Sequence, residues 1–506
     1  MLNTIIFFQK AMTVRKLFKC KRKNPNQKQL SVHALNYFFC SIQQLTENDF
    51  IRVISEALDV TVDDVRGELK KLTGKMRSNI TCCVEYPYVD EYYRDTYYSL
   101  YSRKHSPINR YCFRISFFSS DVTEDNFFTI DMRGLYFGYA VLRPTPKRLL
   151  GYTFLSPLVF LKHDFSCCLC MKKSLIMGRK MSVYAFPFSG QDGEMVSCSE
   201  TALIMLLDYF SRRYNQYSRL LPSEIAALQE PASSERELPT QGLDVGSIGH
   251  ILQTCGLKVK IYQKKENDDE EFGCTEEEFI RLMSIYINSG FPLYACTKSH
   301  AMLVIGKINS LSDENLQVIT MNDNERPYTT LNSIQSITEF LVPLSDKIYL
   351  DAERVDARAA LKKIKKFIPT FYSSYNLDNY SERLYLTTSK AIKSHLVSLS
   401  SCNDTRILIA CTPMPRFVWV NEMTEKVQGK KSLAENQVEL LSVFDATACN
   451  VNYNYLIMAL DNKHILVPES AKDNPQHKSY HLYKIDGINI KPYMNNLNGE
   501  HTKWEN

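Results

Sequence analysis

Residues 199–321 carry helix-like apolar patterns followed mainly by strand-like ones, and this grouping restricts the folds open to the chain. Apolar residues recur at the spacing of an amphipathic helix in residues 199–213, 245–255 and 275–287. Shorter apolar runs, typical of strands, occupy residues 257–262, 290–296, 300–306 and 316–321. Because most helix patterns precede most strand patterns, we expect an α+β domain whose helices and antiparallel strand meander form separate halves.

The chain of 506 residues is too long for one hydrophobic core, so we expect several domains. The patterns predict a basic tail at residues 1–30, an N-terminal α+β domain at 31–180, the central domain at 181–345 and a C-terminal α+β, strand-rich domain at 350–506. The predicted fold class is therefore α+β, with the central domain flanked on both sides.

The flanking regions have helix and strand patterns of their own. In the N-terminal domain, a threonine precedes each helix pattern at residues 46–58 and 61–72, and strand patterns follow at 112–118 and 135–142. In the C-terminal domain we expect helices at residues 358–368 and 382–399. The strands expected there are residues 406–411, 417–422, 438–444, 455–460 and 464–467, with the last two joined as a hairpin.

The charge balance argues against several classes of partner. With 61 basic and 56 acidic residues, the net charge of +5 does not favour a polyanion as partner of the whole chain. Basic residues crowd only the first thirty positions, which we interpret as a solvated tail, so nucleic acid is not an expected partner. No run reaches the roughly twenty apolar residues of a membrane helix. Residues 2–8 are too short for a signal peptide, and Met12 is an alternative start that would remove them.

The cysteines indicate a reducing compartment. Their number, 15, is odd and their spacing is irregular, unlike a disulfide framework, so we expect a cytoplasmic protein. Cys167, Cys168 and Cys170 supply three thiols, but no second pair follows at zinc-finger spacing. We therefore interpret them as buried or surface thiols, and we predict no metal and no cofactor.

One cysteine stands in a chemically distinct position. Cys198 follows a turn-forming segment and heads the first helix pattern of the central domain, where free N–H groups and the helix dipole favour a thiolate. Gln191 precedes it closely enough for its amide and the Cys198 N–H to bind one oxyanion. His300 heads a strand pattern, and Asn322 and Asp323 close the next one. These residue types supply the base and the orienting group that a thiol nucleophile requires.

Residues 186–330 resemble the papain-like superfamily of cysteine peptidases, and most of all the bacteriocin-processing double-glycine peptidases. The similar features are Gln191, Cys198-x-x-x-Ala202-Leu203, the strand after Gly256, the Gly290-Phe-Pro292 segment before His300, and Asp323. The resemblance implies that Cys198 is the nucleophile and His300 the general base and acid. It further implies that Asp323 or Asn322 orients the histidine, and that Gln191 and the Cys198 N–H form the oxyanion hole.

The expected function is thiol-dependent hydrolysis of a peptide or isopeptide bond, with a peptide or protein as substrate and the flanking domains selecting it. A transglutaminase-like acyltransferase or a deamidating enzyme would use the same triad with another acceptor. A catalytically inactive domain that binds peptides is the other alternative. Because side chains alternate along a strand, we expect only one of the two adjacent residues Asn322 and Asp323 to face His300. The resemblance implies that it is Asp323, since the similar families place an acid there.

Overall fold

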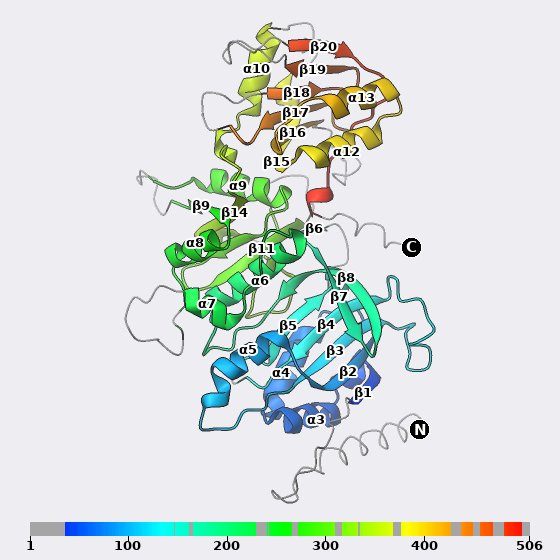
Figure 1. The fold of residues 1–506 in the computed structure, drawn as a ribbon, viewed down its shortest axis with the longest axis vertical. Helices are drawn as coiled ribbons and strands as arrows, with labels where there is room; N and C mark the ends of the chain where they lie inside the picture. Colours follow the sequence, from blue (N-terminus) through cyan, green and yellow to red (C-terminus); the bar gives the residue numbers. More distant parts are fainter. Residues whose placement is uncertain are drawn as a thin grey trace, which may run out of the picture.

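The structure, a computed structural model, describes residues 36–145, 147–160, 165–228, 240, 242–265, 272–308, 316–331, 334–367, 376–426, 437–448, 456–468 and 480–497. These residues form three antiparallel sheets accompanied by helices (Figure 1), which confirms the prediction of a multidomain α+β chain. The predicted basic tail at residues 1–30 lies outside the described residues. Within the ranges given, no helix combines the length and apolar content that crossing a membrane requires.

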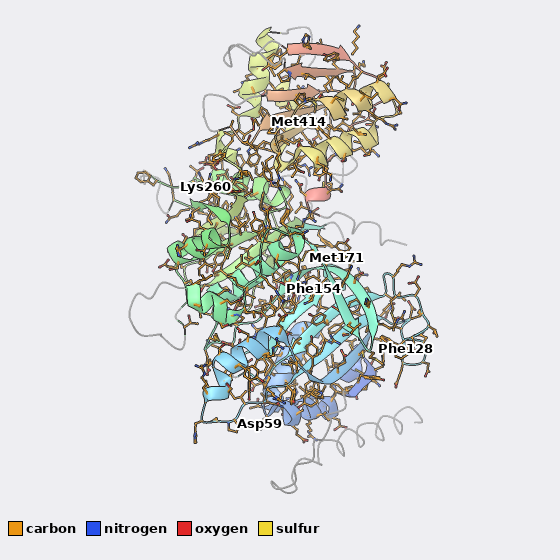
Figure 2. All side chains as sticks on the ribbon, in the orientation of Figure 1. Asp59, Phe128, Phe154, Met171, Lys260 and Met414 are labelled. Carbon is orange, nitrogen blue, oxygen red and sulfur yellow. The ribbon has the colours of Figure 1, made fainter. Side chains whose placement is uncertain are left out.

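The N-terminal sheet has the strand order β1-β2-β3-β4-β5-β8-β7. Its strands are β1 (Asn36–Ser41), β2 (Ile80–Tyr88), β3 (Cys112–Ser119), β4 (Tyr136–Leu142), β5 (Leu150–Leu155), β7 (Cys170–Ile176) and β8 (Arg179–Phe188). Its helices are α2 (Ile42–Leu45), α3 (Asn48–Leu58), α4 (Val62–Thr73) and α5 (Glu91–Ser99). Thr61 caps α4 by accepting a hydrogen bond from the Asp64 N–H, and Asp59 ends α3 with a left-handed φ of 59° (Figure 2). The two predicted helices are therefore confirmed, but the capping role expected of Thr46 is wrong: Glu47 is the N-cap of α3, and Thr46 ends α2.

The N-terminal and central sheets are not separated along the chain at the predicted boundary. β8 pairs with β5 and β7, so the boundary expected between residues 180 and 181 falls inside a strand of the N-terminal sheet. The short strand β6 (Phe165–Cys167) pairs instead with a strand of the central sheet. The chain thus leaves the N-terminal sheet after β5, adds β6 to the central sheet, and returns to the N-terminal sheet with β7 and β8.

The central sheet has the strand order β13-β12-β11-β10-β14-β9, with β6 paired to β11. Its strands are β9 (Leu257–Gln263), β10 (Leu293–Cys296), β11 (Ala301–Ile308), β12 (Val318–Met321), β13 (Thr329–Leu331) and β14 (Glu339–Ser345). Its helices are α6 (Cys198–Arg213), α7 (Pro222–Leu228), α8 (Val245–Thr254) and α9 (Glu276–Asn288). β10 to β13 form the expected meander, whereas β14 returns to lie between β10 and β9.

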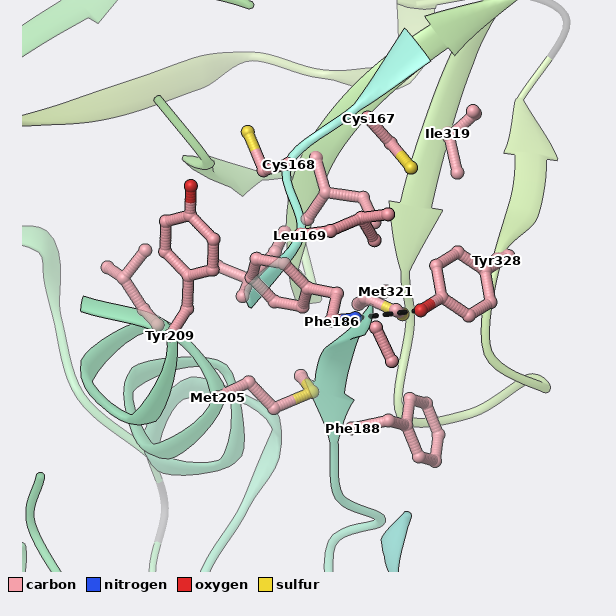
Figure 3. Packing of buried hydrophobic residues seen from close by; sticks show 14 of the residues in the cluster. Cys167, Cys168, Leu169, Phe186, Phe188, Met205, Tyr209, Ile319, Met321 and Tyr328 are labelled. Carbon is pink, nitrogen blue, oxygen red and sulfur yellow. Dashed lines mark hydrogen bonds between the residues drawn. The ribbon is translucent and has the colours of Figure 1, made fainter. Parts of the chain in front are cut away.

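Helix α6 lies between the N-terminal and central sheets and is buried on all sides from Ser199 to Phe210. It packs against β7 and β8 on one side and against β10 and β11 on the other. Burial on both sides explains why its apolar residues are not confined to one face of the helix. Figure 3 shows part of this shared core. The Tyr328 hydroxyl accepts the Phe186 N–H and donates to the Leu155 carbonyl, each at 2.8 Å, and Phe186 stacks on Tyr209 of α6. Side chains therefore fill the space between the sheets, including the fully buried Phe154 (Figure 2).

The C-terminal sheet runs in chain order from β15 to β20. Its strands are β15 (Tyr380–Thr388), β16 (Phe417–Glu425), β17 (Leu440–Asp445), β18 (Leu456–Leu460), β19 (His464–Pro468) and β20 (Tyr480–Lys484), and its helices are α10 (Ala357–Phe367), α12 (Ser389–Leu399) and α13 (Asn403–Cys411). Val418 and Val420 face a core shared with α12 and α13, whereas Trp419 between them faces the main core, as strand alternation requires. β18 and β19 pair as the predicted hairpin.

Two predictions in this domain were wrong. The helix expected at residues 382–399 begins only at Ser389, where the Thr388 hydroxyl accepts the Ala391 N–H. Residues 380–388 form β15, which pairs with β16 along its whole length. The strand expected at residues 406–411 is instead part of α13, in which Ile409 is buried and Ile407 is exposed. A short apolar run fits either structure, and here the Asn403-Asp404 helix start decides.

Candidate active site

Cys198 is the first residue of α6, and the segment before it is held by two buried carboxylates. Asp192 accepts the backbone N–H groups of Glu194, Met195 and Val196 at 2.9, 2.8 and 3.0 Å through one oxygen. Glu200, in the first turn of α6, accepts the Ser197 N–H at 2.9 Å and the Thr240 hydroxyl at 2.6 Å. These bonds fix the turn that delivers the half-buried Cys198 to the helix N-terminus, where unpaired N–H groups favour a thiolate.

The Cys198 thiol interacts with the His300 imidazole and the Ala301 backbone N–H, both of which lower its pKa. Burial raises the pKa of the Cys198 thiol, but His300 and the Ala301 N–H together lower it more, so the net pKa lies below its ordinary value. The interaction with Cys198 is also the largest cause of a raised His300 pKa. Both shifts favour a thiolate and imidazolium pair.

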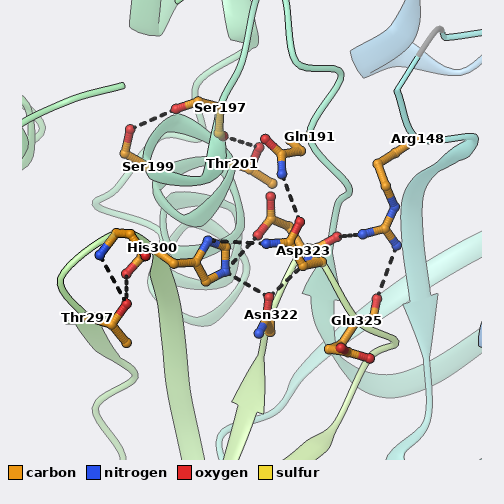
Figure 4. Close-up of polar contacts among 12 residues, drawn as sticks. Arg148, Gln191, Ser197, Ser199, Thr201, Thr297, His300, Asn322, Asp323 and Glu325 are labelled. Atoms are coloured by element: carbon orange, nitrogen blue, oxygen red, sulfur yellow. Dashed lines mark hydrogen bonds and ion pairs between the residues drawn. The ribbon is translucent and has the colours of Figure 1, made fainter. Parts of the chain in front are cut away.

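His300 lies directly before β11, and the contact at its Nε2 atom orients the ring. The Thr297 N–H donates to the His300 carbonyl at 2.8 Å, which holds the backbone. The ring Nε2 lies 2.8 Å from Asn322 Oδ1 and 3.3 Å from Asp323 Oδ1 (Figure 4). Because an amide oxygen only accepts hydrogen bonds, Nε2 carries a proton and donates it to Asn322. This leaves Nδ1 as the nitrogen that takes the proton of Cys198.

Asn322 and Asp323 both approach His300, contrary to the expectation that only one of them would. β12 ends at Met321, and residues 322–325 form a turn in which the Glu325 N–H donates to the Asn322 carbonyl at 3.0 Å. Strand alternation therefore does not apply to this pair. Burial raises the pKa of Asp323 to about 6, against the lowering effect of His300 and Arg148. Asn322 thus supplies the hydrogen bond and Asp323 the charge.

Gln191 reaches the site through Asn324. Its amide Nε2 donates to Asn324 Oδ1 at 2.9 Å, and Asn324 Nδ2 lies 3.4 Å from His300 Nδ1 (Figure 4). The structure therefore brings together all five residues selected from the sequence, and it adds Asn324 between Gln191 and His300. Sequence reasoning passed over Asn324 because an asparagine beside Asn322-Asp323 looks like ordinary turn composition.

The turn that carries Asn322 and Asp323 is anchored by the N-terminal domain. The guanidinium of Arg148, from the loop before β5, donates to the carbonyls of Asp323 and Glu325. Arg148 also pairs with Glu68 of α4 at 3.2 Å, and both side chains are buried. Sequence reasoning missed Arg148 and Glu68, since no local pattern connects them with a turn so distant in the chain. Glu200, by contrast, was readable from the Ser197-x-x-Glu200 capping signature.

The other cysteines differ from Cys198 in environment. Burial raises the pKa of Cys168 to about 12, and it also raises those of Cys167 and Cys170. Cys402 shares a lowered pKa, caused first by the Thr405 backbone N–H and then by the Thr405 hydroxyl and the Asp404 N–H. Cys198 combines a helix N-terminus with a histidine that lowers its pKa. Within the described part of the chain, no group of three His, Cys, Asp or Glu side chains has the geometry of a metal site.

No protein-family model matches the chain, and no curated protein sequence matches it. The functional interpretation therefore depends on the geometry and chemistry of the site itself.

Proposed function

We propose that the central domain is a papain-like, thiol-dependent hydrolase that cleaves a peptide or isopeptide bond. The observation that carries the proposal is Cys198 at the N-terminus of α6, with a thiol pKa that His300 lowers and an imidazole pKa that Cys198 raises. The 2.8 Å contact of His300 with Asn322 completes the constellation of nucleophile, base and orienting group.

The reaction would begin with transfer of the Cys198 proton to His300 Nδ1. The thiolate sulfur bonds to the substrate carbonyl carbon, and the carbonyl π electrons move to the oxygen. Collapse of this oxyanion breaks the C–N bond, and the amine leaves with the proton from His300. A water molecule then attacks the thioester while His300 takes one of its protons, and the C–S bond breaks to release the acid and restore Cys198.

The oxyanion requires donors that face the carbonyl oxygen in the transition state. The Cys198 N–H, in the first turn of α6, has no acceptor within its own helix, and the Gln191 amide lies at the same end of the site through its bond to Asn324. Two such donors are typical of acyl-transfer sites, and loss of one costs about 10²- to 10³-fold in rate. We propose these two groups as the oxyanion hole.

The test is competitive alkylation with limiting iodoacetamide at pH 6.5, followed by mass-spectrometric mapping of the modified cysteines. Cys198 should react first, and His300→Ala should slow it strongly. Cys402 is the internal control, because its lowered pKa depends on Thr405 and Asp404 and should be indifferent to the His300 substitution. Labelling of Cys198 that is equally indifferent to His300→Ala would remove the basis for the proposal.

Product analysis identifies the acceptor. Incubation with a peptide library should yield new carboxyl termini in the wild-type protein and none in Cys198→Ala. Acyltransferases and deamidating enzymes share the first half-reaction, so amine-linked products or conversion of glutamine to glutamate would identify those activities instead. Binding of peptides without any product would indicate an inactive peptide-binding domain. We also propose a cytoplasmic location, because every cysteine in the described ranges is a free thiol.

A further inference from the structure

Asn324 lies between the two groups that the proposed reaction needs. Its Oδ1 accepts the Gln191 Nε2–H at 2.9 Å, and its Nδ2 lies 3.4 Å from His300 Nδ1 (Figure 4). The bond from Gln191 requires the oxygen of the Asn324 amide to face Gln191, so the amide nitrogen faces the imidazole. One exposed side chain thus contacts the oxyanion donor and the proton acceptor together.

The contact between Asn324 and His300 depends on the protonation of the ring. An amide nitrogen only donates hydrogen bonds, so it can bond to Nδ1 only while Nδ1 keeps its lone pair. Nε2 already carries the proton that is donated to Asn322 Oδ1. Transfer of the Cys198 proton to Nδ1 would place two donors face to face. Asn324 therefore competes with Cys198 for the Nδ1 lone pair and opposes the proton transfer that the shifted pKa values of Cys198 and His300 favour.

The Asn324 side-chain amide also accepts the hydrogen bond that Gln191 would otherwise donate to a substrate. While Gln191 donates to Asn324 Oδ1, that N–H is not directed at a substrate oxygen. A substrate carbonyl presents the same kind of acceptor as Oδ1, so it can replace Asn324 as the partner of Gln191. Once Gln191 donates to the substrate carbonyl, the Asn324 amide is no longer held by Gln191. Its nitrogen is then free to turn away from His300 Nδ1.

The backbone beneath Asn324 is held firmly, so only its side chain has to move. The Asn324 N–H donates to Asn322 Oδ1 at 3.0 Å, and the Asn324 carbonyl accepts from Lys71 Nζ at 3.5 Å. Arg148 holds the carbonyls on both sides, those of Asp323 and Glu325. Rotation of an exposed side chain on a fixed turn is a fast motion.

We propose that Asn324 is a gate residue that keeps the site in a resting state until a substrate carbonyl displaces it from Gln191. This inference rests on the proposed function, since it assigns a regulatory contact to the same Cys198 and His300 pair. The gate links binding of a carbonyl at the oxyanion hole to release of His300 Nδ1. It would reduce reaction of the thiol with small electrophiles that do not engage Gln191.

The test compares alkylation of Cys198 by iodoacetamide in the wild-type protein and in Asn324→Ala at pH 6.5. The variant should react about fivefold faster, the factor that corresponds to loss of one neutral hydrogen bond of about 1 kcal/mol. Asn79→Ala, the same change at another exposed asparagine, is the matched control and should leave the rate unchanged. The other ionisable groups that face the pair, Asp323, Tyr294 and Cys296, stay the same in all variants.

Asn324→Asp provides a second prediction, in which alkylation and peptide turnover change in opposite directions. A carboxylate can accept from both Gln191 and a protonated Nδ1, so alkylation should again be faster than in the wild type. Peptide turnover should be slower, because the charged acceptor holds Gln191 more tightly. Equal or slower alkylation in Asn324→Ala would overturn the gate and make Asn324 a positioning residue.

The His300→Ala substitution, made in the wild-type protein and in Asn324→Ala, distinguishes failure of the gate from failure of the proposed function. If this substitution slows Cys198 in the wild type but Asn324→Ala has no effect, the hydrolase proposal stands and the gate is wrong. If His300→Ala changes nothing in either background, Cys198 and His300 do not act as a pair and the proposed function fails with the gate.

Discussion

Replacing Asp323 by asparagine should stabilise the protein at neutral and alkaline pH, because the Asp323 carboxylate is held in an unfavourable environment. The residue is 1% exposed, and burial raises its pKa from the usual 3.8 to about 6 although His300 and Arg148 act against the shift. A difference of about 2 pKa units corresponds to about 3 kcal/mol of stability. Asparagine has nearly the same shape and carries no charge at any pH.

The direction of the pH dependence follows from linkage between proton binding and folding. Since the pKa is higher in the folded state, the folded protein binds this proton more tightly than the unfolded chain. The resulting stabilisation is fully present below about pH 4 and is lost as the pH rises through about 6. The stability contributed by His300, whose pKa is raised by Cys198 and by Asp323, is lost in the same direction as the pH rises. The variant should therefore gain stability relative to the wild type as the pH increases.

Urea unfolding at pH 4.5, 6 and 8 measures this difference. The stability of Asp323→Asn minus that of the wild type should rise by about 2 kcal/mol between the two extremes, since part of the titration occurs below pH 4.5. Asp346→Asn is the control, because Asp346 is fully exposed and its removal should give a small, constant difference. A difference for Asp323→Asn that is independent of pH, or that falls with pH, would refute the assigned pKa shift.

Three further substitutions test the support of the site. Asn322→Ala removes the acceptor at 2.8 Å from Nε2 and should lower kcat about 10- to 100-fold with little change in KM, the usual cost of losing an orienting partner; steady-state kinetics decides. Arg148→Met leaves the buried Glu68 with only Lys71 at 3.9 Å and the Leu150 N–H as partners and should lower the free energy of unfolding by about 1–3 kcal/mol, measured in urea. Asp192→Ala leaves three N–H groups without their acceptor and should cost about 1–3 kcal/mol in the same assay while slowing alkylation of Cys198.

The central elements were predictable because their signals are local. The start of α6 at Cys198 follows from a serine, a glutamate three residues later and a long apolar run, all within one short segment. α8 and α9 begin after Asp244 and Thr275, whose side chains accept N–H groups of the first turn. In each case the capping side chain and the apolar spacing agree, so the helix bounds were correct to within about two residues, the usual uncertainty of a helix end.

The two wrong predictions in the C-terminal domain occurred where local signals conflict. Residues 382–388 have apolar spacing that also fits a helix, but Tyr385 is buried and Thr387 and Thr388 are β-branched residues that favour a strand. Pairing with β16 supplies the deciding hydrogen bonds, and those come from residues about forty positions away. Single-sequence periodicity contains no information about that partner, so it extended α12 too far towards the N-terminus.

The turn at residues 322–325 shows the same limit at the site itself. An arginine in a loop is normally solvent-exposed, so the position of Arg148 did not suggest a role in the central domain. Folding places it under the turn, where it binds two carbonyls while Glu68 neutralises it. The N-terminal sheet also contains β8, whose residues continue past position 180 into the segment that leads to Gln191. The N-terminal domain is therefore part of the wall of the site, and a chain that started at residue 181 would lose Arg148 and the first two residues of β8 together.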